Sequence, residues 1–450
     1  MIERALFGAL FVTIWITSEA SHLGRQRMFS NPVPAWEIPK LPEIRRVSVH
    51  QSKRARFHGH VLRDLNTTCG MSCQMKRSSK PTNTRELENG LAFETLDMQN
   101  YELTNVKIEV GDVPQELIAT NETNSLSPQT EEIDIDDTEF DDDVDVLERR
   151  RRNIFGLDTR FAIPSRKYTT MYPFSTAVKL STGCSGVLLS PKRVLTSAHC
   201  IHDGKRYVKG VRKLKIGKLM KTMQKQRGKG KRRKAGRGKK QRKSKNKKPK
   251  KDSTNDVQGD SNQRSKRDVS FMREPIAPYF KWVRSKRIHI PQGWLDAAKN
   301  SKTSEFPIEY DYAVIELKRA LGTEYMDIGI CPEKEAIPSG HRIHFTGFDT
   351  DRSNQMLYRF CPIEGESPDL MYHYCDAQEG TSGSGIYIRL YDKQTERWSR
   401  KVIGVFSGHQ RVQFPDGSHK EFNTGVRITP LKYAQICYWT KGDYSQCRGG

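Results

Sequence analysis

The chain has 450 residues and a net charge of +24, so one or two domains are expected. No stretch of about 18 apolar residues follows the first apolar run, which excludes a membrane-spanning helix. The charge is unevenly distributed, because residues 1–152 carry −6 and residues 153–450 carry +30.

The N-terminus has the features of a secretory signal peptide over residues 1–20. The apolar run Ala5–Ile16 follows a basic residue, and Ser18-Glu19-Ala20 places small residues where a signal peptidase cuts. A buried N-terminal helix is the alternative. We therefore expect a secreted, extracellular protein whose nine cysteines form disulfides. N-glycosylation sequons occur at Asn66 and Asn121.

Residues 21–152 are expected to form a largely disordered pro-segment. Residues 21–130 are polar and show no sustained periodicity, and residues 131–148 contain 11 acidic side chains in 18 positions. Like charges at that density repel each other, so this acidic tract should be solvated and disordered. Four arginines then end at Arg152, which is typical of a furin-type processing site that would leave Asn153 as a new N-terminus. An ordinary basic patch is the alternative.

From about Arg160 the sequence predicts an all-β domain. Short runs rich in valine, isoleucine, leucine and aromatic residues recur between glycine, proline and serine. One terminal helix is expected over Thr429–Trp439, because proline is favoured in a first turn. The basic segment Lys221–Lys251 has 18 Lys+Arg and no acid. We expect it to be an exposed, disordered insert that extends to about Arg267, a second processing site.

Three motifs carry the chemistry, and they follow one another in chain order. Thr196-Ser197-Ala198-His199-Cys200 follows a predicted strand, and Cys184 lies 16 residues earlier. Asp311 precedes the apolar strand Ala313–Leu317. Gly380-Thr381-Ser382-Gly383-Ser384-Gly385 offers glycines for a tight turn around a serine. A histidine, an aspartate and a serine in this setting suit nucleophilic catalysis.

These motifs resemble those of the chymotrypsin-like (S1-type) serine proteases, and the vertebrate serine protease 23 and 35 group in particular. The resemblance implies a chymotrypsin-like double β-barrel with a C-terminal helix over residues 153–450. It implies His199 as general base, Asp311 as its orienting partner and Ser382 as nucleophile. The N–H groups of Gly380 and Ser382 would form the oxyanion hole.

The resemblance also implies disulfides and a specificity pocket. The implied bridges are Cys184–Cys200, Cys361–Cys375 and Cys437–Cys447. Cys331 would then pair with Cys69 or Cys73, or those two would pair locally and leave Cys331 reduced. Asp376 aligns with the acidic base of a trypsin-type pocket, which would select arginine or lysine. The alternative is that Asp376 is a surface or structural aspartate.

One departure from the family pattern leaves two functions open. Trypsin-like enzymes place an aspartate immediately before the nucleophile, where it pairs with a newly formed N-terminal amine, whereas this chain has Thr381. The first hypothesis is a secreted endopeptidase that cleaves protein or peptide substrates. The second is a catalytically inactive binding protein, held to heparan sulfate or other acidic matrix polymers by its basic insert. The sequence indicates no metal or other cofactor, and the signal peptide argues against nuclear localisation and a nucleic-acid partner.

Overall fold

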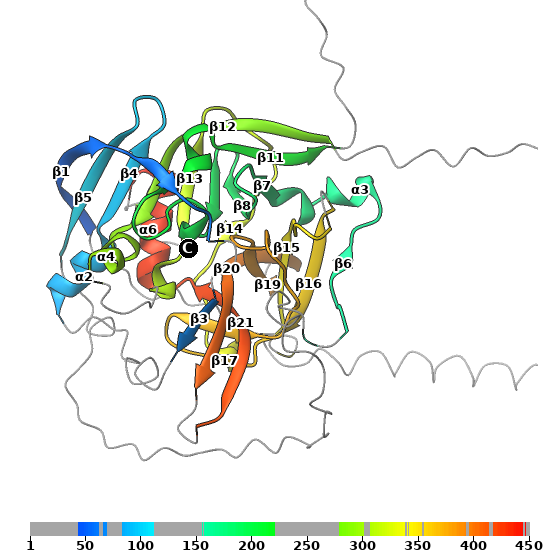
Figure 1. Cartoon of the computed structure of the whole chain (residues 1–450). Helices are drawn as coiled ribbons and strands as arrows, with labels where there is room; N and C mark the ends of the chain where they lie inside the picture. The colour runs from blue at the N-terminus through cyan, green and yellow to red at the C-terminus, as the bar shows by residue number, and fades with distance from the viewer. Residues whose placement is uncertain are drawn as a thin grey trace, which may run out of the picture. The chain divides into compact units, whose positions relative to one another are not determined.

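The computed structural model describes part of the chain, and Figure 1 shows the arrangement of its helices and strands. The described residues are 44–62, 66–69, 83–111, 155, 157–220, 279–300, 307–337, 340, 342–352, 355–392, 396–413, 417–443 and 446. Several sequence predictions lie outside them: the signal peptide 1–20, the acidic tract 131–148, Asn121, Arg152, Asn153, the insert Lys221–Lys251, Arg267, Cys73 and Cys447. In the described ranges no helix is long and apolar enough to cross a membrane.

The first half of the domain is a closed barrel of six strands. Their order is β12-β11-β7-β8-β9-β13, and β13 pairs back to β12. The barrel closes around buried aliphatic side chains such as Leu180, Leu188, Ile216, Ile288 and Ile315. The strands are β7 (Ala177–Leu180), β8 (Ser185–Ser190), β9 (Arg193–Thr196), β11 (Lys215–Met220), β12 (Tyr279–Pro291) and β13 (Ala313–Leu317).

The second half is built on a separate sheet in the order β17-β18-β21-β20-β19-β15-β16-β6. Two short strands, β3 and β14, pair with β20 beside this path. The bounds are β3 (Asn66–Cys69), β6 (Phe161–Ala162), β14 (Asp327–Ile328), β15 (Arg342–Gly347), β16 (Leu357–Pro362), β17 (Gly365–Glu366), β18 (Leu370–His373), β19 (Gly385–Asp392), β20 (Arg397–Gln413) and β21 (His419–Arg427). The predicted all-β fold is therefore confirmed.

The predicted C-terminal helix is present as α6 (Pro430–Lys441). Thr429 caps it by accepting a hydrogen bond from the Lys432 amide, and Gly442 ends it at a φ of 85°. The other helices are α2 (Thr84–Leu91), α3 (Arg166–Thr169) and α4 (Gln292–Asn300). The 3-10 turns are η3 (Phe174–Thr176), η4 (Ala198–Cys200), η5 (Lys209–Lys213), η6 (Ile308–Tyr310) and η7 (Lys334–Ala336).

Part of the expected pro-segment is folded, which the sequence analysis did not predict. The strands of this region include β1 (Ile44–Arg54), β2 (Phe57–Gly59), β4 (Phe93–Asp97) and β5 (Glu102–Val110). Strand β2 pairs with β10 (Tyr207–Val208) of the protease domain. Strand β4 pairs antiparallel with β12 of the barrel, and β5 and β1 extend the sheet from there (Figure 1, blue). The loosely structured interpretation therefore does not hold for residues 44–62 and 83–111.

Candidate active site

The histidine and the aspartate of the predicted triad are brought together by strand register. His199 lies on η4, immediately after β9, and Thr196 of β9 pairs with Ala313 of β13. This register places Asp311 beside the histidine. The Nδ1 atom of His199 lies 2.7 Å from Asp311 Oδ2, and the His199 amide donates to Asp311 Oδ1 at 2.8 Å. Both side chains are fully buried.

A third group, Ser407, completes the support of the aspartate. Its hydroxyl donates to Asp311 Oδ2, so the carboxylate accepts from a ring nitrogen, an amide and a hydroxyl. This arrangement favours the tautomer that carries its proton on Nδ1, and it leaves Nε2 as the basic atom of His199. No local pattern indicates this role of Ser407, because the serine is 96 residues from Asp311 in the chain.

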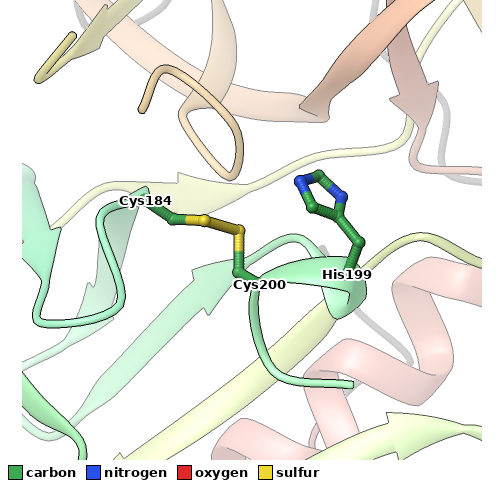
Figure 2. A group of neighbouring side chains, drawn as sticks. All are labelled: Cys184, His199 and Cys200. Carbon is green, nitrogen blue, oxygen red and sulfur yellow. A yellow bond between two sulfur atoms is a disulfide. The ribbon is translucent and has the colours of Figure 1, made fainter. Parts of the chain in front are cut away.

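A disulfide fixes the turn that carries His199. Cys184 and Cys200 are bridged with a Cα–Cα distance of 6.2 Å. Figure 2 shows this bridge beside the imidazole, with His199 and Cys200 on the same short turn. The two sulfur atoms and a ring nitrogen of His199 lie within 4.8 Å of one another. Sulfur in a disulfide is not a thiolate ligand, so this cluster does not form a metal site.

The serine lies on a turn that only glycine permits at two positions. Gly380 and Gly383 have φ values of 98° and 87°. A Cβ on Gly380 would lie 2.5 Å from the Phe348 carbonyl oxygen, and one on Gly383 would lie 2.3 Å from the Ser185 carbonyl oxygen. Side chains at either position would therefore push the turn away from the strands behind it.

Ser382 and His199 do not share a hydrogen bond in this structure. The Ser382 hydroxyl donates to the Ser407 carbonyl oxygen at 3.2 Å. The Nε2 atom of His199 is buried and has no hydrogen-bond partner among the described residues. Only 7% of Ser382 is exposed, so the nucleophile and the base are both shielded from solvent.

Thr381, the residue before the nucleophile, is held by a buried carboxylate elsewhere in the chain. Its hydroxyl donates to Asp349 Oδ1 at 2.7 Å. The other oxygen of Asp349 accepts from Arg160 Nη1 at 2.8 Å and from Arg359 Nη2. The amide of Gln378 also donates to this oxygen at 3.2 Å. An aspartate and two arginines thus stand where the family pattern has one aspartate and a terminal amine, a network the sequence analysis did not find.

Asp376 is a structural residue in this fold. Its carboxylate accepts from the Phe155 amide, the Thr159 amide and the Thr159 hydroxyl, each at 2.7 Å. Asp376 is 1% exposed. It therefore lacks the unengaged carboxylate that the base of a cation-binding pocket requires, and the alternative reading of this residue fits the structure better.

The remaining cysteines fall into two states. Cys361 and Cys375 are bridged, and Cys437 is also disulfide-bonded. Cys331 is a buried free thiol, and burial raises its pKa to about 11. A bridge from Cys331 to the N-terminal region is therefore absent from this structure.

The fold and the His199–Asp311 pair are those of a trypsin-like serine protease. A family model described as Trypsin matches residues 164–258. A solved structure of a Glu endopeptidase in complex with MPD is 17% identical, with a TM-score of 0.39, and the match covers 64% of this chain and 100% of that chain.

Two relatives match nearly the whole chain. Inactive serine protease 35 from Homo sapiens is 43% identical over 415 residues, which is 92% of this chain and 93% of the relative. Serine protease 23 from Homo sapiens is 37% identical over 444 residues, which is 98% of this chain and 99% of the relative. The chain belongs to the trypsin-like serine protease family, in the group that contains serine protease 35 and serine protease 23. Of these two relatives, inactive serine protease 35 has the higher identity to this chain.

Proposed function

We propose that the chain is a secreted serine endopeptidase that hydrolyses peptide bonds with His199, Asp311 and Ser382. The observation that supports this most directly is the double hydrogen bond between His199 and Asp311, with Ser407 as a third donor. A histidine held in this way keeps Nε2 available for a proton.

The reaction proceeds through an acyl-enzyme. The Ser382 hydroxyl rotates from the Ser407 carbonyl toward Nε2 of His199, gives up its proton and attacks the scissile carbonyl. The amides of Gly380 and Ser382 stabilise the oxyanion. His199 then protonates the leaving amine, and a water molecule attacks the acyl-enzyme by the same route in reverse. Asp311 stabilises the imidazolium formed in each half of the reaction.

Labelling with a fluorophosphonate probe tests this function. The processed protein should take up the probe on Ser382, and Ser382→Ala should abolish the labelling. His199→Ala should lose most of the labelling, because base and nucleophile act as one unit. Folded, processed protein that takes up no probe between about pH 6 and pH 9, the range where a histidine base works, would refute the enzyme function.

Two processing steps belong to this proposal. Removal of residues 1–20 would accompany secretion, and cleavage after Arg152 would separate the pro-segment from residues 153–450. We also propose N-glycans at Asn66 and Asn121. Asn66 begins β3, and only its backbone lies in the described part of the chain.

A second candidate function is binding without catalysis. The insert Lys221–Lys251 carries 18 of the +30 charges of residues 153–450. A segment of this charge would bind sulfated glycosaminoglycans by releasing their counterions, as proteins do on phosphate polymers. A relative that carries the name inactive serine protease 35 supports this second candidate. The probe experiment separates the two functions.

A further inference from the structure

We propose that the cleft around Ser382 is a binding site for the chain's own N-terminal region, and that residues 57–62 and 66–69 are its ligand. This inference rests on the proposed function of the same site. It concerns how the site is occupied and regulated, which neither the family nor the triad determines. Four sets of contacts support it.

The first set holds the segment beside the loop that follows His199. Strand β2 pairs in parallel with β10, and Phe57 lies opposite Tyr207 in the register. The amide of His60 donates to Asp203 Oδ2 at 3.3 Å. Gly59 approaches so closely that a Cβ would lie 2.6 Å from the Arg206 carbonyl oxygen. The backbone of residues 57–60 is thus fitted to this loop.

The second set closes the nucleophile turn. Val61 and Leu62 line the same small pocket as Cys184, Gly380 and Ser382. Val61 packs against the core of the first barrel, and Leu62 against the core that contains α6. Two apolar side chains therefore line the pocket beside Ser382 and the predicted oxyanion amides, which we call the apolar entrance, and only 7% of Ser382 is exposed.

The third set occupies the strand edge next to the site. Strand β3 pairs in parallel with β20, from Asn66 opposite His409 to Cys69 opposite Val412. Strand β20 pairs along these residues with β21 on its other edge, so β3 fills the edge that remains. Extended peptides bind proteins by adding a strand to such an edge. Ser407, which contacts both Asp311 and Ser382, lies only two residues before the paired stretch.

The fourth set keeps the ligand attached to the protease. Leu91, Phe93 and Leu96 are at most 3% exposed and belong to the two large cores. Gln435 of α6 donates to the Leu91 carbonyl oxygen at 2.8 Å. Because these contacts do not depend on the covalent link at Arg152, cleavage there leaves the segment beside the cleft. A ligand that is held nearby in this way rebinds at a high effective concentration.

A double variant, Val61→Asp with Leu62→Asp, tests the proposal. It places two charges in the apolar entrance, and burying an unpaired carboxylate is strongly unfavourable. Val49→Asp is the matched control, because Val49 lies in β1 of the same N-terminal region and is 43% exposed. Each is made with Ser382 intact and with Ser382→Ala.

Two measurements follow, and the first does not depend on catalysis. In the Ser382→Ala proteins, hydrogen exchange of those amides of residues 409–412 that face β3 rather than β21 should be roughly tenfold faster in the double variant, because exchange follows the population of the open form. Exchange in β9 should not change. With Ser382 intact, the fluorophosphonate labelling rate should rise roughly tenfold, since it scales with the open fraction. Val49→Asp should change neither.

The outcomes separate this proposal from the proposed function. Faster exchange with no labelling of any protein would support the bound segment and refute the enzyme. Equal exchange in the parent and the double variant would overturn the proposal. Measurable labelling at the same rate in the two proteins would also overturn it. Ser382-dependent cleavage within residues 57–69 would also overturn it, because the segment would then be a substrate.

Discussion

Replacing Arg160 with leucine removes the most densely bonded buried cation in the described structure. Its guanidinium donates to Asp158 Oδ1 at 2.9 Å, to Asp349 Oδ2 at 2.8 Å and to Asp351 Oδ2 at 2.7 Å. The Arg160 side chain is 2% exposed. Hydrogen bonding to Arg160 lowers the pKa of Asp158 to about 2. This carboxylate therefore stabilises the fold above its ordinary pKa near 3.8, and the contribution is lost as the pH falls toward 2.

The loss of stability in Arg160→Leu depends on which hydrogen-bond partners each carboxylate keeps. Asp349 is fully buried but retains Arg359 and Thr381 as partners. Asp158 and Asp351 are partly exposed and can return to water. Removing one partner of a buried ion pair costs about 3–5 kcal/mol. The surviving partners place Arg160→Leu at the lower end, about 3 kcal/mol, which lowers Tm by roughly 6–12 °C for a domain of this size.

Thermal unfolding of the processed protein measures this difference, and Arg352→Leu is the control. Arg352 donates to the same Asp158 carboxylate, but its side chain is 34% exposed. Exposed pairs contribute about 0–1 kcal/mol, so the control should move Tm by only a few degrees. Equal losses in the two variants would refute the reasoning that burial and the Asp349 contact make Arg160 important.

The remaining predictions concern pH, the N-terminal region and the insert. Burial lowers the pKa of His289 and of His373 to about 3, whereas unfolded histidine titrates near 6.5. Their neutral forms therefore stabilise the fold above pH 6.5, and this stabilisation is lost as the pH falls toward 3. A midpoint of urea unfolding that does not change between pH 7 and pH 4 would contradict this prediction. Phe93→Ala should destabilise even the protein cleaved after Arg152, by about 3–5 kcal/mol in urea unfolding; no change would mean that the region is released. Deleting residues 221–251 should lower the salt needed to elute the protein from heparin, and elution with the parent would exclude the insert as the anchor.

The parts of the site that the sequence predicted are those carried by short motifs. The segment around His199 and Cys200 combines a strand, a turn and one cysteine of a disulfide within a few residues. The turn around Ser382 needs glycine at positions 380 and 383, and both glycines can be read directly from the sequence. The start of α6 was predictable from Pro430, because proline favours the first turn of a helix and this preference depends on the local sequence alone.

The parts that could not be predicted depend on partners far along the chain. Asp349 binds Arg160 across 189 residues, and Asp376 binds Thr159 across 217 residues. Nothing near either aspartate indicates those partners. The carboxylate of Asp376 is engaged by Phe155 and Thr159, so the structure favours the alternative that Asp376 is a structural aspartate.

The N-terminal region was missed for a different reason, since its signals are short. Asn83 caps α2 by accepting from the Glu86 amide at 2.9 Å, and asparagine followed three residues later by glutamate is a known start signal. Val106, Ile108 and Val110 alternate with exposed residues along β5, as a half-buried strand requires. Each signal covers too few residues to stand out in a polar region. Pairing of β4 with β12 and packing into the two large cores stabilise them together.

The position of Arg160 bears on what cleavage after Arg152 can achieve. In trypsin-like enzymes the cut creates the amine that orders the turn before the nucleophile. Here Thr381 is held by Asp349, and Asp349 is paired with Arg160 and Arg359 within the intact chain. The charges that order this turn are therefore in place before any cut is made, and a new amine at Asn153 would add no necessary partner. If the site is to be switched on, the step that remains is departure of residues 57–62 and 66–69 from the cleft. Because the contacts of residues 83–111 do not involve the cut, proteolysis alone would leave the site open for only a small fraction of the time, and full activity would require a competing peptide or partner.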